Sequence, residues 1–203
     1  MSVGVVTIAF TDGAHAETIA REVATRLNFR YLNNEILDLA AKEAGVEADQ
    51  VASVEKSESL IARIVRSLGS VPSPEMGISP LAAMPDERPE YRAIIQEVVK
   101  RVAAEGKVVI GAHGAGISLA GTPGLLRVFL TAPVETRVAR LREEKGLDEK
   151  TARHEVEHTD RERKNYFDRF FRIQEQPSLY DMVLSTGTLS DAQAVSAVLA
   201  AAG

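Results

Sequence analysis

The stretch that decides the fold is VGVVTIAFTDGAHAETIA, residues 3–20. It opens with a run of apolar, mostly β-branched residues over 3–9, which predicts a buried parallel strand. A short polar turn that contains Gly13 follows, and apolar side chains then recur at helical spacing, as at Ile19 and Val23. A strand, a tight turn and a helix in this order predict the first unit of a parallel α/β sheet.

A turn in this position holds phosphate when its residues follow the pattern GxxxxGK[ST]. The glycines let backbone N–H groups surround the phosphate, the lysine contacts the outer phosphates, and the hydroxyl binds magnesium. This chain keeps Gly13 and, at most, Thr18. The sequence therefore predicts a phosphate-binding turn that lacks most of its side-chain chemistry, although Gly13 is explained equally well by a tight turn.

The composition limits the class of protein. The 203 residues suit one domain or a domain with an excursion, and 45% apolar with 26% charged residues is ordinary for a globular protein. A net charge of −5 argues against non-specific nucleic-acid binding. The absence of cysteine excludes disulfides and thiolate metal sites. No apolar run has the length of a membrane span or signal peptide. We expect a cytoplasmic protein with no nucleic-acid or membrane partner.

Other apolar runs predict the remaining strands, at 108–111, 126–131 and, more weakly, 182–184, while 29–32 is either a strand or an extended turn. About a hundred residues separate the first two clear strands, too many for one crossover. We expect helices there over 35–44, 51–68 and 91–104. Five prolines predict a loop over 70–89, between the last two helices.

Arginine residues gather after the strand at 126–131. Arg137 and Arg140 follow its carboxyl end, where open α/β sheets place their ligands, and Arg161 and Arg163 lie in a later charged segment. The break at 146–148 between the two groups suits a hinged lid that brings guanidinium groups onto phosphates. A solvated helix with local ion pairs explains the later group equally well.

Five segments, taken in order, resemble the cytidylate kinase-like group of P-loop nucleoside monophosphate kinases. They are VVTIAFTDGAHAETIAREVATRLNFRYLNNEILDLAAKEAG from residue 5, VVIGAHGAGISL from 108, RVFLTAPVETRVARL from 127, TDRERKNYFDRFF from 159 and YDMVLSTGTLSDAQAV from 180. The resemblance runs nearly end to end and implies a single P-loop NTPase-type domain, a parallel sheet flanked by helices. Its core would comprise 1–30, 105–145 and 178–203, with a helical monophosphate-binding insertion over 31–104 and a lid over 146–177.

The same resemblance implies ATP and Mg²⁺ as cofactors, a CMP-like nucleoside monophosphate as acceptor, and a set of site residues. For catalysis these are Arg137, Asp160, Arg161 and Arg163. For the ATP phosphates they are Gly13, Ala14, His15, Ala16, Glu17, Thr18 and Arg140. For the acceptor they are Asn33 and His113. No residue is assigned to a resident metal.

Several of these positions depart from the family pattern. His15, like Phe10, stands where the family has a glycine, Ala16 stands at the lysine, and Glu17 stands at the magnesium-binding hydroxyl. Three further departures lie outside the turn: Gly111 replaces an acidic magnesium ligand, His113 an arginine and Asn33 an aspartate.

Each of these residues keeps a plain structural alternative. His15 is either a phosphate donor or a polar loop residue, and Glu17 either a magnesium ligand or a charge that suits the helix dipole. His113 either contacts a ligand or forms a local contact in a glycine-rich turn. His154 and His158 have metal-ligand spacing on a helix, but without a third ligand they predict an exposed helical face.

Three functions follow from these observations. The first is transfer of the ATP γ-phosphoryl group to a pyrimidine nucleoside monophosphate. The second is a nucleotide-binding regulatory protein without transfer, because the lysine, the hydroxyl and the acidic magnesium ligand are all missing. The third is a scaffold that associates, for example as a homodimer, through the helix over 51–68.

Overall fold

The computed structural model describes residues 2–43, 89–112 and 114–203. The predicted helix over 51–68, all of the predicted loop except its last residue, and His113 lie outside the described residues. The chain divides into two units, one of Met1–Asn33 with Lys100–Gly203 and the other of Asn34–Val99.

The smaller unit contains α2 (Glu35–Glu43) and the first part of α4 (Pro89–Glu105). α4 begins two residues before the helix predicted over 91–104. Proline suits the first turn of a helix because its missing N–H has no partner there in any case. Pro89 thus belongs to a helix rather than to the loop in which the sequence pattern placed it.

The larger unit contains a five-stranded sheet whose strands are all parallel, in the order β2-β3-β1-β4-β5. The strands are β1 (Val5–Phe10), β2 (Arg30–Leu32), β3 (Val108–Gly111), β4 (Leu125–Thr131) and β5 (Met182–Ser185). Val5 of the central strand is in register with Val108 on one side and Leu125 on the other. The predicted parallel α/β fold is confirmed, and the run over 29–32 is a strand.

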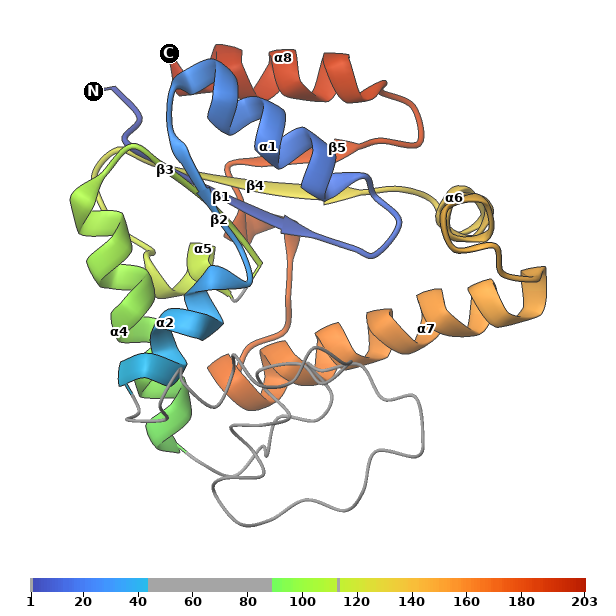
Figure 1. Ribbon diagram of the computed structural model, residues 1–203, viewed down its shortest axis with the longest axis horizontal. Helices are drawn as coiled ribbons and strands as arrows, with labels where there is room; N and C mark the ends of the chain where they lie inside the picture. Colours follow the sequence, from blue (N-terminus) through green and yellow to red (C-terminus); the bar gives the residue numbers. More distant parts are fainter. Residues whose placement is uncertain (1, 44–88, 113) are drawn as a thin grey trace, which may run out of the picture. The chain divides into compact units, whose positions relative to one another are not determined.

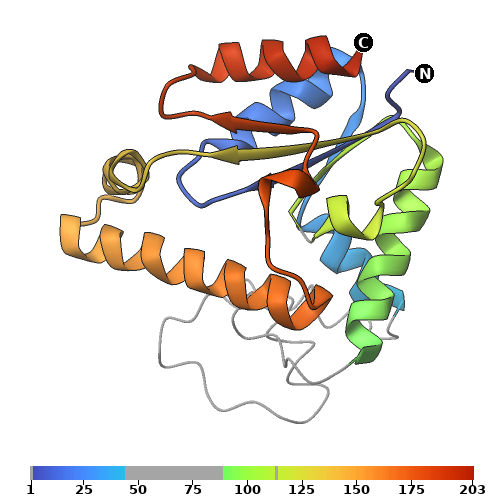
Figure 2. The same cartoon turned by 180° about the vertical axis from the view of Figure 1, so that it is seen from behind.

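The other helices of this unit are α1 (Ala16–Leu27), α5 (Ala115–Ser118), α6 (Val134–Lys145), α7 (Glu149–Tyr166) and α8 (Asp191–Ala202). Figures 1 and 2 show α1 and α8 side by side on one face of the sheet. Ile19 of α1, Val195 of α8 and Val6 of β1 meet in the core there and are at most 2% exposed. Burial of β1 between layers explains its continuous apolar run.

α6 and α7 form a separate layer with a small core of Val138, Leu141, Ala152 and Val156. The Asp148 side chain accepts a hydrogen bond from the Thr151 N–H and caps the start of α7. A π-helical turn (Phe167–Phe171) and a 3₁₀ turn (Pro177–Leu179) then lead to β5. The predicted charged segment is therefore the second half of α7 and the turn after it.

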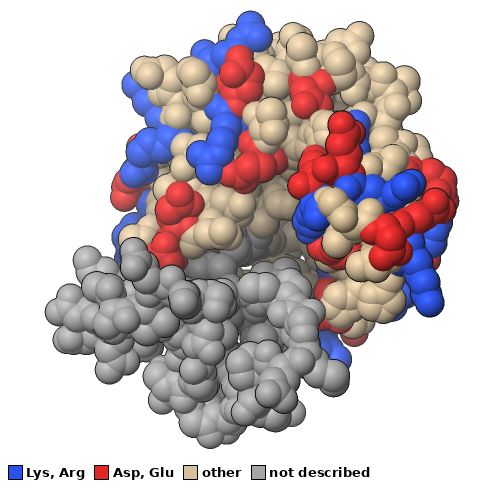
Figure 3. Space-filling view, turned by 45° about the vertical axis from the view of Figure 1, so that its right-hand side comes forward, with Lys and Arg blue, Asp and Glu red and all other residues tan. Residues whose placement is uncertain are grey.

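Charged side chains of both signs occur together on one face of the molecule (Figure 3). On the face shown in Figure 3, basic and acidic side chains alternate over the described residues. Within the described parts of the chain, no helix has both the length and the apolar character needed to span a membrane.

Candidate functional site

The turn between β1 and α1 packs closely against α6. Gly13 has a positive φ of 78°, and a Cβ atom at this position would lie 2.8 Å from Leu141 Cδ1 and 2.9 Å from Arg137 Cβ. His15, the residue before α1, also lies in the left-handed region, at φ 56°. Gly13 is therefore required by the packing of the turn, whether or not a phosphate approaches it.

Every backbone carbonyl from Phe10 to His15 accepts a hydrogen bond. Within the turn and α1, Thr11 O accepts from the Ala14 N–H and His15 O from the Ile19 N–H. The other four accept from side chains: Phe10 O from Arg163 (2.8 Å), Asp12 O from Arg137 (3.4 Å), Gly13 O from Arg140 (3.0 Å) and Ala14 O from Thr186 (3.1 Å). All the carbonyl groups of the turn are therefore engaged in hydrogen bonds within the protein.

The N–H groups at the start of α1 have no such partners. Among the described residues, the backbone N–H groups of His15, Ala16, Glu17 and Thr18 donate no hydrogen bond, and no side chain caps the helix. Unpaired N–H groups and the helix dipole give this end of α1 a partial positive charge that favours anions. The arrangement fits the phosphate groups of ATP.

The His15 side chain points toward two carboxylates. Its Nδ1 lies 3.1 Å from Asp191 Oδ1 at the start of α8, and its Nε2 lies 3.4 Å from Glu144 Oε1 in α6. The imidazole therefore links the turn to both helices.

Arg137, Arg140 and Arg163, which we call the arginine side of the turn, are all engaged in contacts within the protein. Arg137 is 3% exposed, binds Asp160 through two hydrogen bonds of 2.9 and 2.7 Å, and donates through Nε to Ala132 O. Arg140 donates to the Thr186 hydroxyl and carbonyl as well as to Gly13 O.

Arg163 lies between two aromatic rings. Its guanidinium carbon lies 5.1 Å from the centre of the Phe129 ring and 5.0 Å from that of Phe167. Its remaining donors bind Glu175, which also accepts a hydrogen bond from Tyr180. Burial raises the pKa of the Tyr180 hydroxyl above its usual range, so this hydroxyl stays protonated and donates at neutral pH.

Arg161 differs from the other three predicted arginines. It is exposed on α7, and among the described residues it forms no ion pair or hydrogen bond. The structure thus brings Arg137, Arg140, Arg163 and Asp160 together around the turn and leaves Arg161 at the surface.

A second cluster, which we call the tyrosine side of the turn, joins the start of α1 to the ends of β2 and β3; it consists of Glu17, Arg21, Tyr31, Asn33 and Gly111. Glu17 accepts hydrogen bonds from the Tyr31 hydroxyl (2.6 Å), the Asn33 amide (3.3 Å) and Arg21 Nε (2.7 Å), and its carboxylate lies 2.6 Å from Arg21 Nη2 in an ion pair. The predicted site residues Glu17 and Asn33 therefore lie together.

Magnesium does not fit the side chains of this cluster. Both Glu17 oxygens already accept hydrogen bonds, and Gly111 offers no ligand. Across the described residues, no group of three or more histidine, cysteine or acidic side chains is arranged to hold a metal ion. The described residues thus fit the phosphates of ATP, whereas the side chains of this cluster do not fit Mg²⁺.

Thr186 and Tyr31 were missed by sequence reasoning. Thr186 is 2% exposed and joins the turn to Arg140, and its only signal is its place after a strand in the segment STGT. Tyr31 lies in a short strand, and the sequence pattern of that strand does not show whether the tyrosine ring only packs against its neighbours or its hydroxyl also forms a hydrogen bond.

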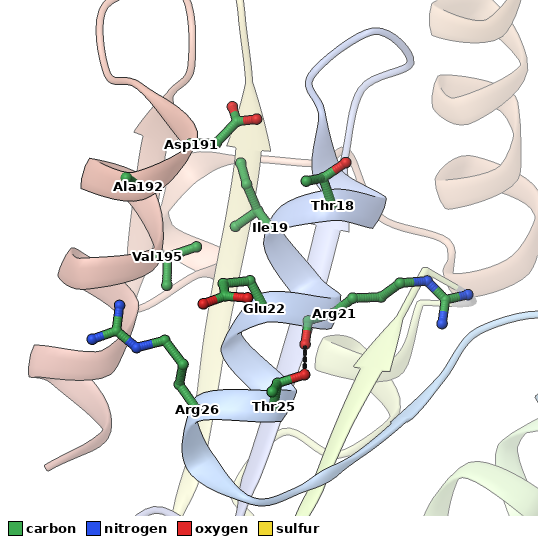
Figure 4. Close-up of a pocket in the computed structure, with 9 residues that line it drawn as sticks. All are labelled: Thr18, Ile19, Arg21, Glu22, Thr25, Arg26, Asp191, Ala192 and Val195. Carbon is green, nitrogen blue, oxygen red and sulfur yellow. Dashed lines mark hydrogen bonds between the residues drawn. The ribbon is translucent and has the colours of Figure 1, made fainter.

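A groove of about 470 Å³ runs between α1 and α8 (Figure 4). Its lining residues are Thr18, Ile19, Arg21, Glu22, Thr25, Arg26, Asp191, Ala192 and Val195. Thr18 is the one predicted site residue on this lining. The groove therefore begins beside the turn and follows the outer surface of α1.

Comparison with known proteins agrees with this geometry. The model of the cytidylate kinase-like family matches residues 5–188. A cytidylate kinase from Methanopyrus kandleri is 27% identical over 135 residues, which cover 62% of this chain and 70% of that protein.

Solved structures share the fold at low sequence identity. An uncharacterized protein from Eubacterium ventriosum has a TM-score of 0.70 at 18% identity and covers 100% of this chain and 98% of its own. Shikimate kinase from Bacteroides thetaiotaomicron has a TM-score of 0.58 at 11% identity and covers 99% and 98%. These neighbours support the P-loop kinase fold, and the match over residues 5–188 shows that the chain belongs to the cytidylate kinase-like family.

Proposed function

We propose that the protein is a kinase that transfers the γ-phosphoryl group of ATP to a nucleoside monophosphate, with CMP or a similar pyrimidine nucleotide as acceptor. The observation that carries this proposal is the turn itself. Its carbonyls accept hydrogen bonds from Arg137, Arg140, Arg163 and Thr186, while the N–H groups at the start of α1 have no partner among the residues that the structure describes. Family membership supports the same reaction class.

In this proposal the backbone N–H groups of residues 15–18 bind the donor phosphates, and the helix dipole of α1 adds to their attraction. Phosphoryl transfer requires mainly positioning and neutralisation of charge, so backbone donors that need no rearrangement contribute directly. Arg161 is the predicted arginine whose guanidinium is not engaged by described residues, and we assign it the direct phosphate contact. Asn33 and His113 remain the predicted acceptor-binding residues. No step is assigned to Mg²⁺.

The test is ATP turnover measured with CMP, UMP and dCMP as acceptors. We expect turnover with at least one of them, and a fall in kcat of about 10-fold or more in Arg161→Gln, as for loss of one charged transition-state contact. Arg142→Gln is the matched control, because Arg142 is also exposed, on the neighbouring helix, and pairs only loosely with Glu149 at 3.6 Å. Absence of turnover with every monophosphate would exclude the kinase proposal.

A second candidate function is nucleotide binding without transfer, in a regulatory or scaffold protein. The engagement of Glu17 by Arg21, Tyr31 and Asn33 favours it, because a metal-assisted transfer lacks its usual protein ligand. Calorimetry with ATP, CMP and CDP separates the two functions, since binding without turnover supports the second. A homodimer also remains a prediction, and the helix over 51–68 on which it depends lies outside the described residues.

A further inference from the structure

The Tyr31 hydroxyl lies between the two positions that the family resemblance assigns to magnesium. It is 2.6 Å from Glu17 Oε2, and it lies 2.9 Å from the position that a Cβ atom would take at Gly111. Glu17 stands at the magnesium-binding hydroxyl and Gly111 at the acidic ligand. The space between these two positions is therefore occupied by a phenol.

Both oxygens of the Glu17 carboxylate are already engaged by neighbouring side chains. Oε1 accepts from Arg21 Nε at 2.7 Å and lies 2.6 Å from Arg21 Nη2 in the same ion pair, and Oε2 accepts from Tyr31 at 2.6 Å and from Asn33 at 3.3 Å. A carboxylate has about four lone-pair sites, so a cation would have to compete here with three hydrogen bonds and the ion pair to Arg21. Arg21 also neutralises the Glu17 charge, and its guanidinium lies 4.9 Å from the centre of the Tyr31 ring.

Gly111 and Tyr31 are sterically linked. A side chain at position 111 would meet the Tyr31 hydroxyl at 2.9 Å and the Asn33 amide carbon at 3.3 Å. An acidic side chain at 111 would also bring a second negative charge toward Glu17. An acidic residue at 111 would therefore force the Tyr31 hydroxyl out of its present position beside Glu17.

We propose that the Tyr31 hydroxyl and the Arg21–Glu17 pair replace the metal-binding groups, so that nucleotide phosphates bind to this chain without help from a divalent cation. This inference rests on the proposed binding of ATP at the turn. Mg²⁺ is usually held by one or two protein oxygens together with substrate phosphates, and this chain supplies neither of the expected oxygens. The N–H groups of α1 remain to bind the phosphates, and they need no cation.

The first experiment measures ATP affinity by calorimetry in EDTA and in excess Mg²⁺. For the natural chain we expect the two dissociation constants to agree within about threefold, a difference below 1 kcal/mol. In the double variant Tyr31→Phe Gly111→Asp, Mg²⁺ is expected to improve affinity by about tenfold or more, because the added carboxylate and Glu17 Oε2, which has lost its hydrogen bond from Tyr31, can then bind the ion. A gain of tenfold with Mg²⁺ in the natural chain would overturn the proposal.

A second measurement does not depend on nucleotide. Bound Mn²⁺ is measured by electron paramagnetic resonance on the nucleotide-free full chain, on Tyr31→Phe alone and on the double variant, each checked for folding by its thermal transition. We expect no bound Mn²⁺ in the natural chain and measurable binding in the double variant. Mn²⁺ bound by the natural chain and lost in Glu17→Gln would overturn the proposal.

The two measurements also keep the two proposals apart. If ATP fails to bind in either buffer, the proposed function is wrong, and the Mn²⁺ result alone decides whether Tyr31 excludes the ion. A folded double variant that binds no Mn²⁺ would show that Tyr31 does not exclude it.

Discussion

On the arginine side of the turn, Arg137, Arg140 and Arg163 are the residue types that the family resemblance leads one to expect, yet they donate to the protein's own carbonyls and carboxylates. On the tyrosine side, Glu17 and Gly111 are not the expected types, yet the cluster satisfies its own hydrogen bonds. The difference teaches that the role of a side chain is determined by the partners that surround it and not by its residue type alone.

The two sides also differ in burial, and this sets the size of the effects to expect. The side chain of Arg137 is 4% exposed and that of Arg163 19%, whereas those of Glu17 and Arg21 are 49% and 63% exposed. Exposed ion pairs contribute little to stability because solvent screens them, while breaking a buried pair leaves a charge without compensation. Mutations on the arginine side should therefore lower the free energy of unfolding more.

The largest effect is expected for Arg137→Ala. The substitution removes both hydrogen bonds to Asp160 and those to the carbonyls of Ala132 and Asp12, and it leaves a cavity beside Leu141. We expect the free energy of unfolding, measured by urea denaturation, to fall by about 3–4 kcal/mol. Arg142→Ala on the same helix is the control, with an expected loss below about 0.5 kcal/mol. Equal losses in the two variants would show that the arginine side does not anchor α7.

Gly13→Ala tests the packing of the turn against α6. The added methyl group would sit 2.8 Å from Leu141 Cδ1 and 2.9 Å from Arg137 Cβ, at a φ of 78°. We expect a loss of about 2–3 kcal/mol from left-handed strain and overpacking together.

Gly106→Ala separates these two causes, because Gly106 has a φ of 70° but no atom within 4 Å of the added Cβ. It should lose about 1 kcal/mol, the strain alone. If Gly13→Ala lowers the free energy of unfolding by no more than Gly106→Ala does, the close packing described for the turn is contradicted.

Thr186→Val removes the hydroxyl that holds the Ala14 carbonyl while keeping the shape of the side chain. We expect a loss of about 1–2 kcal/mol, because a buried acceptor is left without its donor. Hydrogen exchange at the Ala14 and Ile19 N–H groups, which donate to Thr11 O and His15 O, should also become faster, since the turn loses one of its outer supports. Thr188→Val, at an exposed threonine in the same loop, should change neither quantity. Unchanged exchange in Thr186→Val would mean that the remaining donors hold the turn by themselves.

Much of the fold could be predicted from local patterns. The strand at 126–131 is β4 with one added residue, and the run over 3–20 gives β1, the turn and the start of α1. These elements follow from periodicity and burial, which neighbouring residues encode. The start of α4 could not be placed, because proline both blocks helix interiors and suits their first turn.

The site was less predictable, because its contacts join residues far apart in sequence. Thr186 and Ala14 are 172 residues apart, and Arg163 and Phe10 are 153 apart. A sequence pattern shows that an arginine follows a strand, but not whether a carbonyl or a phosphate receives its hydrogen bonds. The sequence therefore identified the candidate positions, whereas the hydrogen-bond partners of these residues could be identified only from the structure.

The smallest effect is expected for Asp181→Asn, and it isolates the contribution of burial. Arg127–Asp181 repeats the chemistry of Arg137–Asp160, with two guanidinium nitrogens on one carboxylate, and the two aspartates are equally exposed at 38% and 37%. The arginines differ in burial, at 25% and 4% exposed, and Asp181 also accepts a hydrogen bond from the Arg127 backbone N–H. Because solvent screens the Arg127 pair, we expect a loss of only about 0.5 kcal/mol at neutral pH.

The pH dependence of this variant checks the same point. The hydrogen bond from Arg127 lowers the pKa of the Asp181 carboxyl below its ordinary value. A lowered pKa means that the contribution to stability is present above the unfolded-state value, about 3.9, and is lost as the pH falls through the folded-state value. Thermal unfolding followed from pH 6 downward should therefore show a shallower acid loss in Asp181→Asn than in the natural chain. Identical slopes, or a loss at neutral pH as large as that of Arg137→Ala, would mean that burial of the arginine does not decide the difference between the two pairs.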